Sequence, residues 1–176
     1  MAKTKEITAL QVLSEMDRLD RIRKAPNMPP QYIIGTKFPE KNANNIENAI
    51  EKFAKIVGFL AERTKTAGRK LEAKYINTVH GRVQVQKETF IPGTSKKGSS
   101  DMKLLIQGKY ITAEIKFGKD TQKEKQKEYQ ELVTKNGGEY VIFKTFQDFL
   151  IWYVSKFGSP AIMQEAIYNL TPKKNS

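Results

Sequence analysis

The strongest constraint on the fold is a pair of apolar, strand-like runs at residues 101–107 and 110–117. Between them lies Gly108-Lys109, and a Gly-containing dipeptide between two such runs predicts a β-hairpin with a two-residue turn. A turn at this position pairs Gln107 with Tyr110, and that pair sets the register of the whole hairpin.

The predicted register gathers charge on one face of the hairpin. It places Lys103 opposite Glu114 and Asp101 opposite Lys116, and directly opposed residues share a face of a sheet. The alternate positions are apolar and are predicted to face the core: Met102, Leu104, Ile106, Ile111, Ala113, Ile115 and Phe117.

Two carboxylates on one face can perform metal-assisted chemistry. Asp101 and Glu114 could hold a hard cation that activates water and relieves negative charge at phosphorus. A lysine beside them, such as Lys116, could orient the nucleophile or stabilise developing charge. The alternative interpretation is a solvated hairpin face with ordinary cross-strand charge pairs.

The net charge of the chain favours a polyanionic partner. Lys and Arg number 31 against 19 Asp and Glu among 176 residues, which gives a net charge of +12 and a pI near 9.7. Basic side chains displace the counterions condensed on a phosphate backbone. We therefore expect nucleic acid as the partner, ahead of anionic membranes and acidic proteins.

The composition also limits the possible metal sites and locations. Cysteine is absent and His80 is the single histidine, so a bound metal is expected to have oxygen ligands, which suits Mg²⁺, Mn²⁺ or Ca²⁺. The N-terminus has no signal-peptide pattern, and the longest apolar cluster, residues 149–154, is too short to span a bilayer. We expect a soluble, intracellular, cytoplasmic protein with no membrane partner.

Periodicity predicts an α/β fold in which a mixed sheet is flanked by helices, in the core order α-β-β-β-α-β-α. Helices are expected at 6–24, 45–64, 120–135, 146–157 and 159–169, and strands at 82–91, 101–107, 110–117 and 139–144. The division predicted from these elements is an N-terminal helix and Pro-containing arm (1–44), a main domain (45–158) and a C-terminal short helix and tail (159–176). The apolar stripe of residues 7–22 could form a dimer contact or pack on its own domain.

Four parts of the sequence form a recognisable series: Lys97-Gly-Ser-Ser-Asp101, Gly108-Lys-Tyr-Ile-Thr-Ala-Glu114-Ile-Lys116, Gln126 and Gly137-Gly-Glu-Tyr-Val-Ile-Phe143. With this series the chain resembles the PD-(D/E)xK nuclease superfamily. Within that superfamily it is most similar to the virus-type replication-repair nuclease (VRR-NUC) domain, over about residues 45–153.

The resemblance implies a restriction-endonuclease-like core and Mg²⁺-dependent hydrolysis of phosphodiester bonds in structured DNA, with Mn²⁺ as a possible substitute. It makes Asp101 and Glu114 metal ligands, adds the main-chain carbonyl of Ile115 as a third, and makes Lys116 the catalytic lysine. The chain departs from the pattern at Ser100, where the motif that names the superfamily has proline.

Other residues are candidates for supporting roles. Gln126 lies on the sheet-facing stripe of its predicted helix, and the resemblance implies a glutamine beside the metal. Either Glu47 or Glu51, one helical turn apart, could add a ligand, or both could be ordinary surface charge. The candidates for contacts with DNA are Lys96, Lys97, Ser99, Ser100, Lys103 and Lys119.

The sequence therefore predicts a metal-dependent DNA endonuclease that acts on branched or structured DNA. A Holliday junction resolvase or a replication, recombination or repair enzyme of phage type fits this expectation, and a homodimer would suit a four-way junction. The alternative is a non-catalytic, basic DNA-binding module with a nuclease-like fold.

Overall fold

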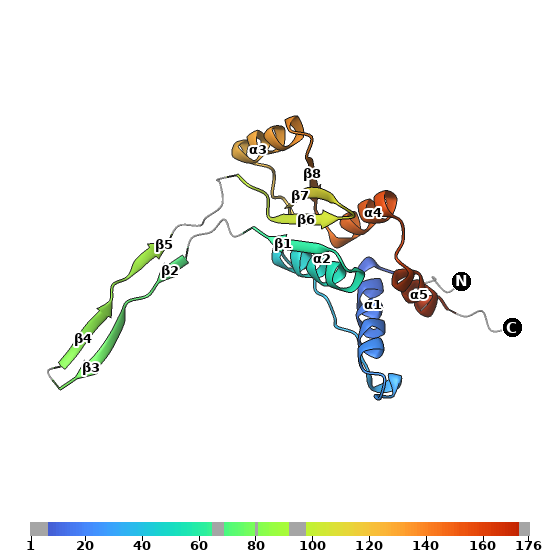
Figure 1. Cartoon of the computed structure of the whole chain (residues 1–176), viewed down its shortest axis with the longest axis horizontal. Coiled ribbons are helices and arrows are strands. Elements are labelled where there is room, and N and C mark those ends of the chain that lie inside the picture. Colours follow the sequence, from blue (N-terminus) through green and yellow to red (C-terminus); the bar gives the residue numbers. More distant parts are fainter. Residues whose placement is uncertain (1–6, 65–68, 80, 92–97, 173–176) are drawn as a thin grey trace.

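The computed structural model describes residues 7–64, 69–79, 81–91 and 98–172, which form a body and a projecting arm (Figure 1). The helices of the body are α1 (Ala9–Lys24), η1 (Pro30–Tyr32, a 3₁₀ turn), α2 (Ala43–Val57), α3 (Glu124–Lys135), α4 (Phe146–Phe157) and α5 (Ala161–Leu170). Its strands are β1 (Leu60–Arg63), β6 (Met102–Ile106), β7 (Lys109–Ile115) and β8 (Glu139–Phe143). The arm, residues 69–91, consists of β2 (Arg69–Leu71), β3 (Lys74–Thr78), β4 (Gly81–Gln86) and β5 (Thr89–Ile91).

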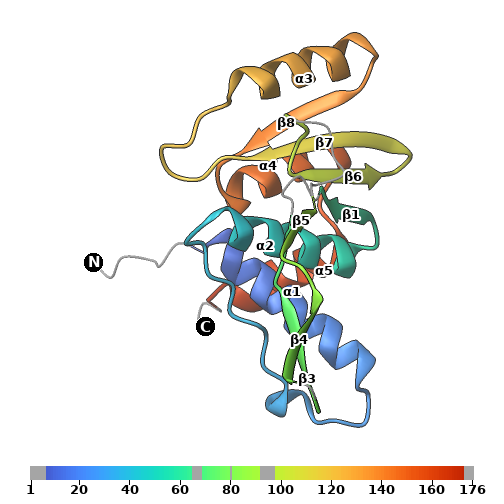
Figure 2. The same ribbon diagram turned by 90° about the vertical axis from the view of Figure 1, so that its left-hand side faces the viewer.

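The body is built on a four-stranded mixed sheet in the order β1-β6-β7-β8. Strands β1, β6 and β7 are antiparallel neighbours, and β8 lies parallel to β7. Helix α3 covers one face, whereas α2 and α4 lie on the other, with α1 and α5 beyond them (Figure 2). These elements confirm the predicted mixed α/β class with a mixed sheet flanked by helices.

The core lies on the α2 and α4 side of the sheet. Phe53 of α2 is at its centre, with its ring 5.5 Å from that of Phe149 and 4.9 Å from that of Tyr153. Phe117 was expected in this core but is 37% exposed, because it follows the end of β7. The six other predicted core positions of the hairpin are buried: Met102, Leu104, Ile106, Ile111, Ala113 and Ile115.

The hairpin turn lies one residue earlier than Gly108-Lys109. Gln107 and Gly108 form the turn, with φ of 49° and 78°, and positive φ at both central residues is typical of a type I′ turn. The register consequently shifts by two residues, so Lys103 lies opposite Thr112. A shift of two leaves every side chain on its predicted face, because side chains alternate with a period of two.

Two other predicted elements were wrong. The helix expected at 45–64 ends at Val57, because Gly58 adopts the left-handed conformation (φ 93°) that terminates helices, and residues 60–63 form β1 instead. The strand expected at 82–91 is divided between β4 and β5, which pair with β3 and β2 in the arm and take no part in the main sheet. The first strand of the sheet is therefore β1.

Helix α1 packs on its own chain. Its apolar stripe, which includes Leu13, Met16 and Leu19, is buried in the same core cluster as residues of α2, the sheet, α4 and α5. The core therefore extends across the boundaries expected at residues 44 and 158. None of the helices in the described ranges is long and apolar enough to cross a lipid bilayer.

A buried carboxylate joins α1 to α2 and to the segment between them. Asp17 is fully buried and forms ion pairs with Lys52 of α2 and, at 2.9 Å, with Arg21. It also accepts hydrogen bonds from the main-chain amide (2.8 Å) and hydroxyl (2.7 Å) of Thr36. Burial alone would raise the pKa of Asp17, but these contacts outweigh it and hold that pKa well below its usual range.

Candidate active site

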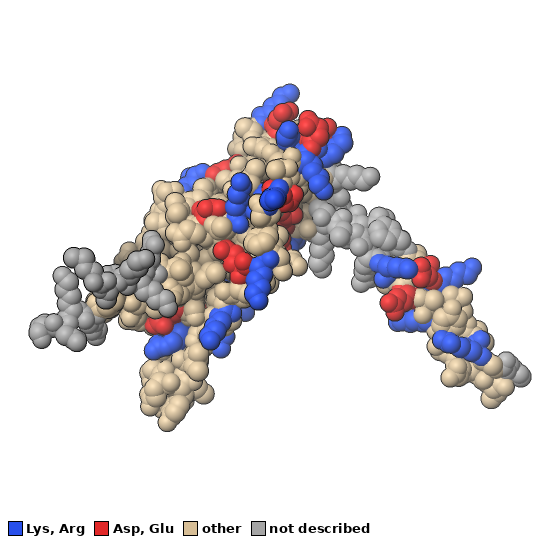
Figure 3. All heavy atoms as spheres, turned by 180° about the vertical axis from the view of Figure 1, so that it is seen from behind, with Lys and Arg blue, Asp and Glu red and all other residues tan. Residues whose placement is uncertain are grey.

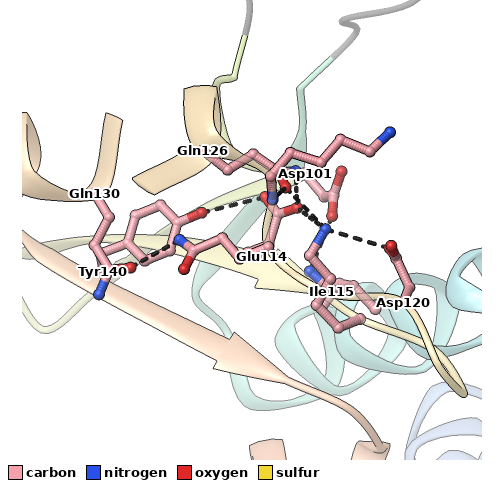
Figure 4. Close-up of polar contacts among 10 residues, drawn as sticks. Asp101, Glu114, Ile115, Asp120, Gln126, Gln130 and Tyr140 are labelled. Carbon is pink, nitrogen blue, oxygen red and sulfur yellow. Dashed lines mark hydrogen bonds and ion pairs between the residues drawn. The ribbon is translucent and has the colours of Figure 1, made fainter. Parts of the chain in front are cut away.

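The candidate site lies on the α3-facing side of the sheet, where β6 begins and β7 ends. Asp101 immediately precedes β6, and its Oδ2 accepts a hydrogen bond of 2.9 Å from the main-chain amide of Ile115. Its own carbonyl accepts one of 2.7 Å from the amide of Thr64, just after β1. These two bonds attach Asp101 to both neighbouring strands, beside Glu114 (Figure 4).

Glu114 of β7 is only 1% exposed, and both of its carboxylate oxygens have partners. Oε1 contacts the ammonium of Lys116 at 2.9 Å and accepts from the side-chain amide of Gln126. Oε2 accepts from the hydroxyl of Tyr140 at 3.4 Å. Gln126 and Tyr140 therefore approach Glu114 from α3 and β8 respectively (Figure 4).

Lys116 is the cation of the site and is 5% exposed. Its main-chain amide donates to the carbonyl of Phe143 at 2.9 Å, which extends the β7–β8 pairing beyond the end of β7. Its ammonium contacts Glu114, the side-chain oxygen of Gln126 at 3.0 Å and Asp120 at 3.3 Å. The structure thus adds Asp120, which was not among the predicted site residues.

Gln126 reaches the site because of the way α3 begins. Its side-chain oxygen accepts a bond of 2.9 Å from the amide of Lys123, the N-cap residue, and thereby caps the helix it belongs to. The same side chain bridges Glu114 and Lys116. Gln122, one turn earlier, bonds instead to Gln130 at 2.7 Å.

The carboxyl groups of the site are shifted toward their neutral forms. Burial raises the pKa of Asp101 above its ordinary value, and the nearby charge of Asp120 raises it further, against the lowering effects of the Ile115 amide and Lys116. Burial likewise raises the pKa of Glu114, and the charge of Asp101 adds to this shift, although Lys116 opposes it. Two neighbouring carboxyls whose charged forms are both disfavoured form a site that favours a cation.

The lysine is shifted toward its charged form. Burial would lower the pKa of Lys116, but the adjoining carboxylates of Glu114 and Asp120 overcome that effect and raise it above its ordinary value. Lys116 is therefore an ammonium group at neutral pH. It can donate hydrogen bonds and stabilise negative charge, and it is poorly suited to accepting a proton from water.

Of the two glutamates on α2, Glu47 is the one whose pKa is affected by the carboxyl groups of the site. Burial raises the pKa of Glu47, and the charges of Asp101, Glu51 and Glu114 raise it further. Arg63 of β1 contacts Glu47 at 3.2 Å and Glu51 at 3.1 Å, and opposes the shift at Glu47. Glu47 therefore belongs to the acidic side of the site, with Arg63 between it and Glu51.

The predicted DNA contacts fall into three groups. Lys96 and Lys97 lie outside the described residues. Ser99 and Ser100 are buried, and the hydroxyl of Ser100 donates to a main-chain carbonyl, so neither side chain faces solvent. Lys103 is half-buried on the site face of the sheet, and Lys119 is exposed.

The donor set fits a hard divalent cation. Mg²⁺ retains most of its waters and commonly binds through one or two carboxylates, and Asp101, Glu114 and the carbonyl of Ile115 supply oxygen donors of that kind. Within the described ranges, no group of three or more Asp, Glu, His or Cys side chains is arranged as a metal cage. A cation at this site would depend on water and substrate oxygens to complete its coordination.

Comparison with known proteins assigns no family to the chain. No protein-family model matches the chain, and no curated protein matches its sequence. The functional argument therefore depends on the residues of the site themselves.

Sequence reasoning missed two of the site residues, Tyr140 and Asp120. Tyr140 joins the site because β8 pairs in parallel with β7 and places it opposite Thr112, on the face that carries Glu114. A parallel register between segments separated by a helix cannot be read from either segment alone. Asp120 could have been considered from the sequence, because it is an acidic residue only four positions after Lys116, with which it forms an ion pair.

Proposed function

We propose that the chain is a Mg²⁺-dependent DNA endonuclease that hydrolyses phosphodiester bonds, with Asp101, Glu114 and Lys116 as its catalytic centre. The observation that carries the proposal is the pair of neighbouring carboxyl groups with raised pKa values beside a buried ammonium group. Such perturbed groups cluster at functional sites, and an ordinary solvated strand face would not bury Glu114 and Lys116 beside a half-buried Asp101.

Each residue has a distinct part in the proposed reaction. Asp101 and Glu114, with the carbonyl of Ile115, would hold Mg²⁺, or Mn²⁺ in its place. The bound ion would lower the pKa of a coordinated water and neutralise charge on the phosphate. Gln126 already links Glu114 to Lys116, and its amide can orient the attacking water or a phosphate oxygen.

Lys116 would act as a charge stabiliser in this scheme. Because its pKa is raised, it stays protonated and donates hydrogen bonds to the phosphate oxygens as negative charge develops. Glu114 and Asp120 hold its ammonium in position. A proton taken from water would consequently leave by another route, through solvent or the substrate.

Two further features support DNA as the substrate. The net charge of +12 favours binding to a phosphate backbone. The resemblance to the PD-(D/E)xK superfamily and its VRR-NUC domain supports a restriction-endonuclease-like core, branched or structured DNA as substrate, and a role in replication, repair or recombination, as for a phage junction resolvase. A homodimer would match the symmetry of a four-way junction.

One observation favours a second candidate, a DNA-binding module that does not cut. Glu114 is almost fully enclosed, and Lys116, Gln126 and Tyr140 satisfy both of its oxygens without any cation. A closed charge network of this kind could be purely structural. The two candidates differ in what Mg²⁺ does to the protein and to bound DNA.

The deciding experiment is cleavage of labelled duplex, single-stranded, flap and four-way-junction DNA, in Mg²⁺ and in EDTA. We expect cleavage in Mg²⁺ alone, and we expect Glu114→Ala to lower its rate at least roughly 100-fold, because the metal site loses a ligand. Glu131→Ala is the matched control, since Glu131 is an exposed glutamate on α3 with no role in the site.

The outcome separates the two candidates. Tight binding of DNA without cleavage of any substrate, in Mg²⁺ or Mn²⁺, would reject the nuclease and leave the binding module. Equal loss of rate in the Glu114 and Glu131 variants would show that the cleavage does not arise at this site.

A further inference from the structure

The arm is a long β-ribbon that leaves the body beside the candidate active site. The chain departs after β1, where the amide of Thr64 bonds to the carbonyl of Asp101, and it returns to Asp101 before β6. In the described part of the chain, the arm strands pair only with one another, β2 with β5 and β3 with β4. The ribbon therefore projects away from the sheet from a root at Asp101 (Figure 1).

One face of the distal ribbon is polar and basic. The register places Tyr75 opposite Gln84 and Asn77 opposite Arg82, and opposed residues share a face. The guanidinium of Arg82 lies 4.3 Å from the centre of the Tyr75 ring, across the two strands. This face therefore presents a planar cation, two amides and an aromatic ring to solvent, which are groups that contact phosphates and bases.

The other face of the distal ribbon is apolar and equally exposed. It carries Ile76 opposite Val83, which are 50% and 46% exposed. Val79 at the tip is 95% exposed. The ribbon thus has two chemically different faces, and both are exposed in the described part of the chain.

Charge is concentrated in the segment that contains the arm. From Thr64 to Gly98 the sequence has eight Lys or Arg residues and two Glu, a net charge of +6, which is half of the chain's +12. Lys and Arg side chains are spread along the described part of the arm (Figure 3). One of them, Lys70, is paired with Glu88 at 2.7 Å, whereas Lys74, Arg82 and Lys87 have no acidic partner among the described residues.

We propose that the arm is a DNA-binding ribbon that holds duplex DNA next to the active site, with the Tyr75 and Arg82 face toward the DNA. A two-stranded β-ribbon fits the major groove of B-DNA, and the uncompensated basic side chains match its phosphates. Because the root of the ribbon is at Asp101, DNA held by the arm leads toward the carboxylates. This inference rests on the proposal that the chain acts on DNA.

The alternative is that the apolar face of the arm binds a second copy of the chain. The charge of the arm disfavours this pairing, because two segments that each carry +6 repel one another. The same charge is an advantage against a polyanion. The large aliphatic side chains that the described part of the arm exposes are Ile76, Val79, Val83 and Val85.

The test measures binding of a 40-base-pair duplex to full-length protein in EDTA, over a series of salt concentrations, so that cleavage plays no part. The arm variant is Lys74→Ala/Arg82→Ala/Lys87→Ala, and the control removes three exposed lysines from the body, Lys37→Ala/Lys55→Ala/Lys135→Ala. A third variant, Ile76→Thr/Val83→Thr, makes the other face polar and keeps β-branched side chains that suit a strand. Sedimentation of each protein reports its association state.

We expect the arm variant to bind roughly 10-fold or more weakly and its salt dependence, the slope of log K against log salt, to fall by about 2–3, one for each lost phosphate contact. The control has the same net charge and should change much less. Equal losses in the two variants would overturn the inference, because they would mean that only total charge matters. Loss of binding together with loss of a dimer, in the threonine variant alone, would assign the arm to a second copy instead.

The two proposals can fail separately. If the wild-type protein cuts no DNA in Mg²⁺ but the arm variant binds DNA more weakly than the control variant does, the nuclease is rejected and the DNA-binding arm remains. If the wild-type protein cuts DNA and the arm variant behaves like the control, the nuclease remains and the arm is rejected.

Discussion

We expect the half-buried carboxyl of Asp101 to weaken the fold that holds it. Its pKa is raised in the folded protein, so its charged form is less stable there than in the unfolded chain. For an acid with a raised pKa, the penalty is present at neutral pH and disappears as the pH falls through that pKa. A destabilising charge retained at one position is typical of a site that serves function before stability.

The first prediction concerns Asp101→Asn. Asparagine keeps an oxygen that can accept from the Ile115 amide and removes the charge, so the free energy of unfolding at pH 7 should rise by about 0.5–2 kcal/mol. The gain should shrink at acid pH, where the wild-type carboxyl is also neutral. Urea denaturation at several pH values measures it, and a less stable variant at pH 7 would mean that the carboxylate stabilises the fold.

The second prediction concerns the metal. Mg²⁺ should raise the melting temperature of the wild-type protein, because a ligand that binds only the folded state stabilises it, by about 2.7 kcal/mol at 100 times its Kd. EDTA should reverse the shift, and Asp101→Asn should show none. An equal Mg²⁺ shift in both proteins would place the ion elsewhere.

Individual elements show how far sequence reasoning extends. Strand periodicity assigned the faces of the β6–β7 hairpin correctly, because an error of two residues in register preserves the alternation. The turn itself was misplaced, since Gly108 is compatible with either central position. Strand β1 was missed because its first residue, Leu60, continues the helical spacing of the apolar residues Phe53 and Val57 of α2. The choice between Glu47 and Glu51 depended on where Arg63 would lie.

The third prediction concerns the hairpin turn. Gln107 has a positive φ of 49°, and Asn is much preferred at this position of a type I′ turn. Gln107→Asn should therefore stabilise the protein by about 0.5–1 kcal/mol, as measured by thermal or urea unfolding. Gly108→Ala, at a φ of 78°, should destabilise it, and stability gained by both variants would argue for a different turn.

The fourth prediction concerns the connection between α1 and α2. Asp17→Asn leaves Lys52 and Arg21 without their buried partner and should cost about 3–5 kcal/mol. The pKa of Asp17 is lowered in the fold, so its contribution is present above its unfolded pKa of about 3.9 and is lost as the pH falls below that value. The free energy of unfolding in urea should therefore differ less between pH 7 and pH 3 in the variant than in the wild-type protein.

The matched control for Asp17 is Asp20→Asn on the same helix. Asp20 pairs with Lys24 near the surface at 2.7 Å, and such pairs contribute about 0–1 kcal/mol. Similar losses in the two variants would show that the buried cluster has no special role.

At the scale of the whole molecule, the hydrophobic core and the proposed DNA-binding arm occupy different parts of the chain. The core cluster includes residues of α1, α2, the main sheet, α4 and α5, and none of the arm residues whose burial the structure describes. The arm joins the body where Arg63 pairs with Met102, so the two ends of the insertion lie on neighbouring strands. The body should consequently fold without it.

The fifth prediction follows from this arrangement. Replacement of residues 65–97 by a short Gly-Ser linker should leave the melting temperature within a few degrees of the wild-type value, because the arm strands pair only with one another in the described structure. Calorimetry measures this directly. A large fall in melting temperature would show that the arm stabilises the sheet.

The attachment of the arm between two adjacent strands also bears on how such a protein can diversify. The entropy of closing a loop grows slowly with its length, by about 0.6 kcal/mol for each doubling, so an insertion at this position can lengthen, shorten or be exchanged at little energetic expense. The strands that carry Asp101 and Glu114 are meanwhile held in register by their own pairing. Mutation can therefore change the length and surface of the ribbon while the strands of the candidate site keep their sequence. If the arm binds DNA as proposed, this insertion point is where a new specificity could be introduced.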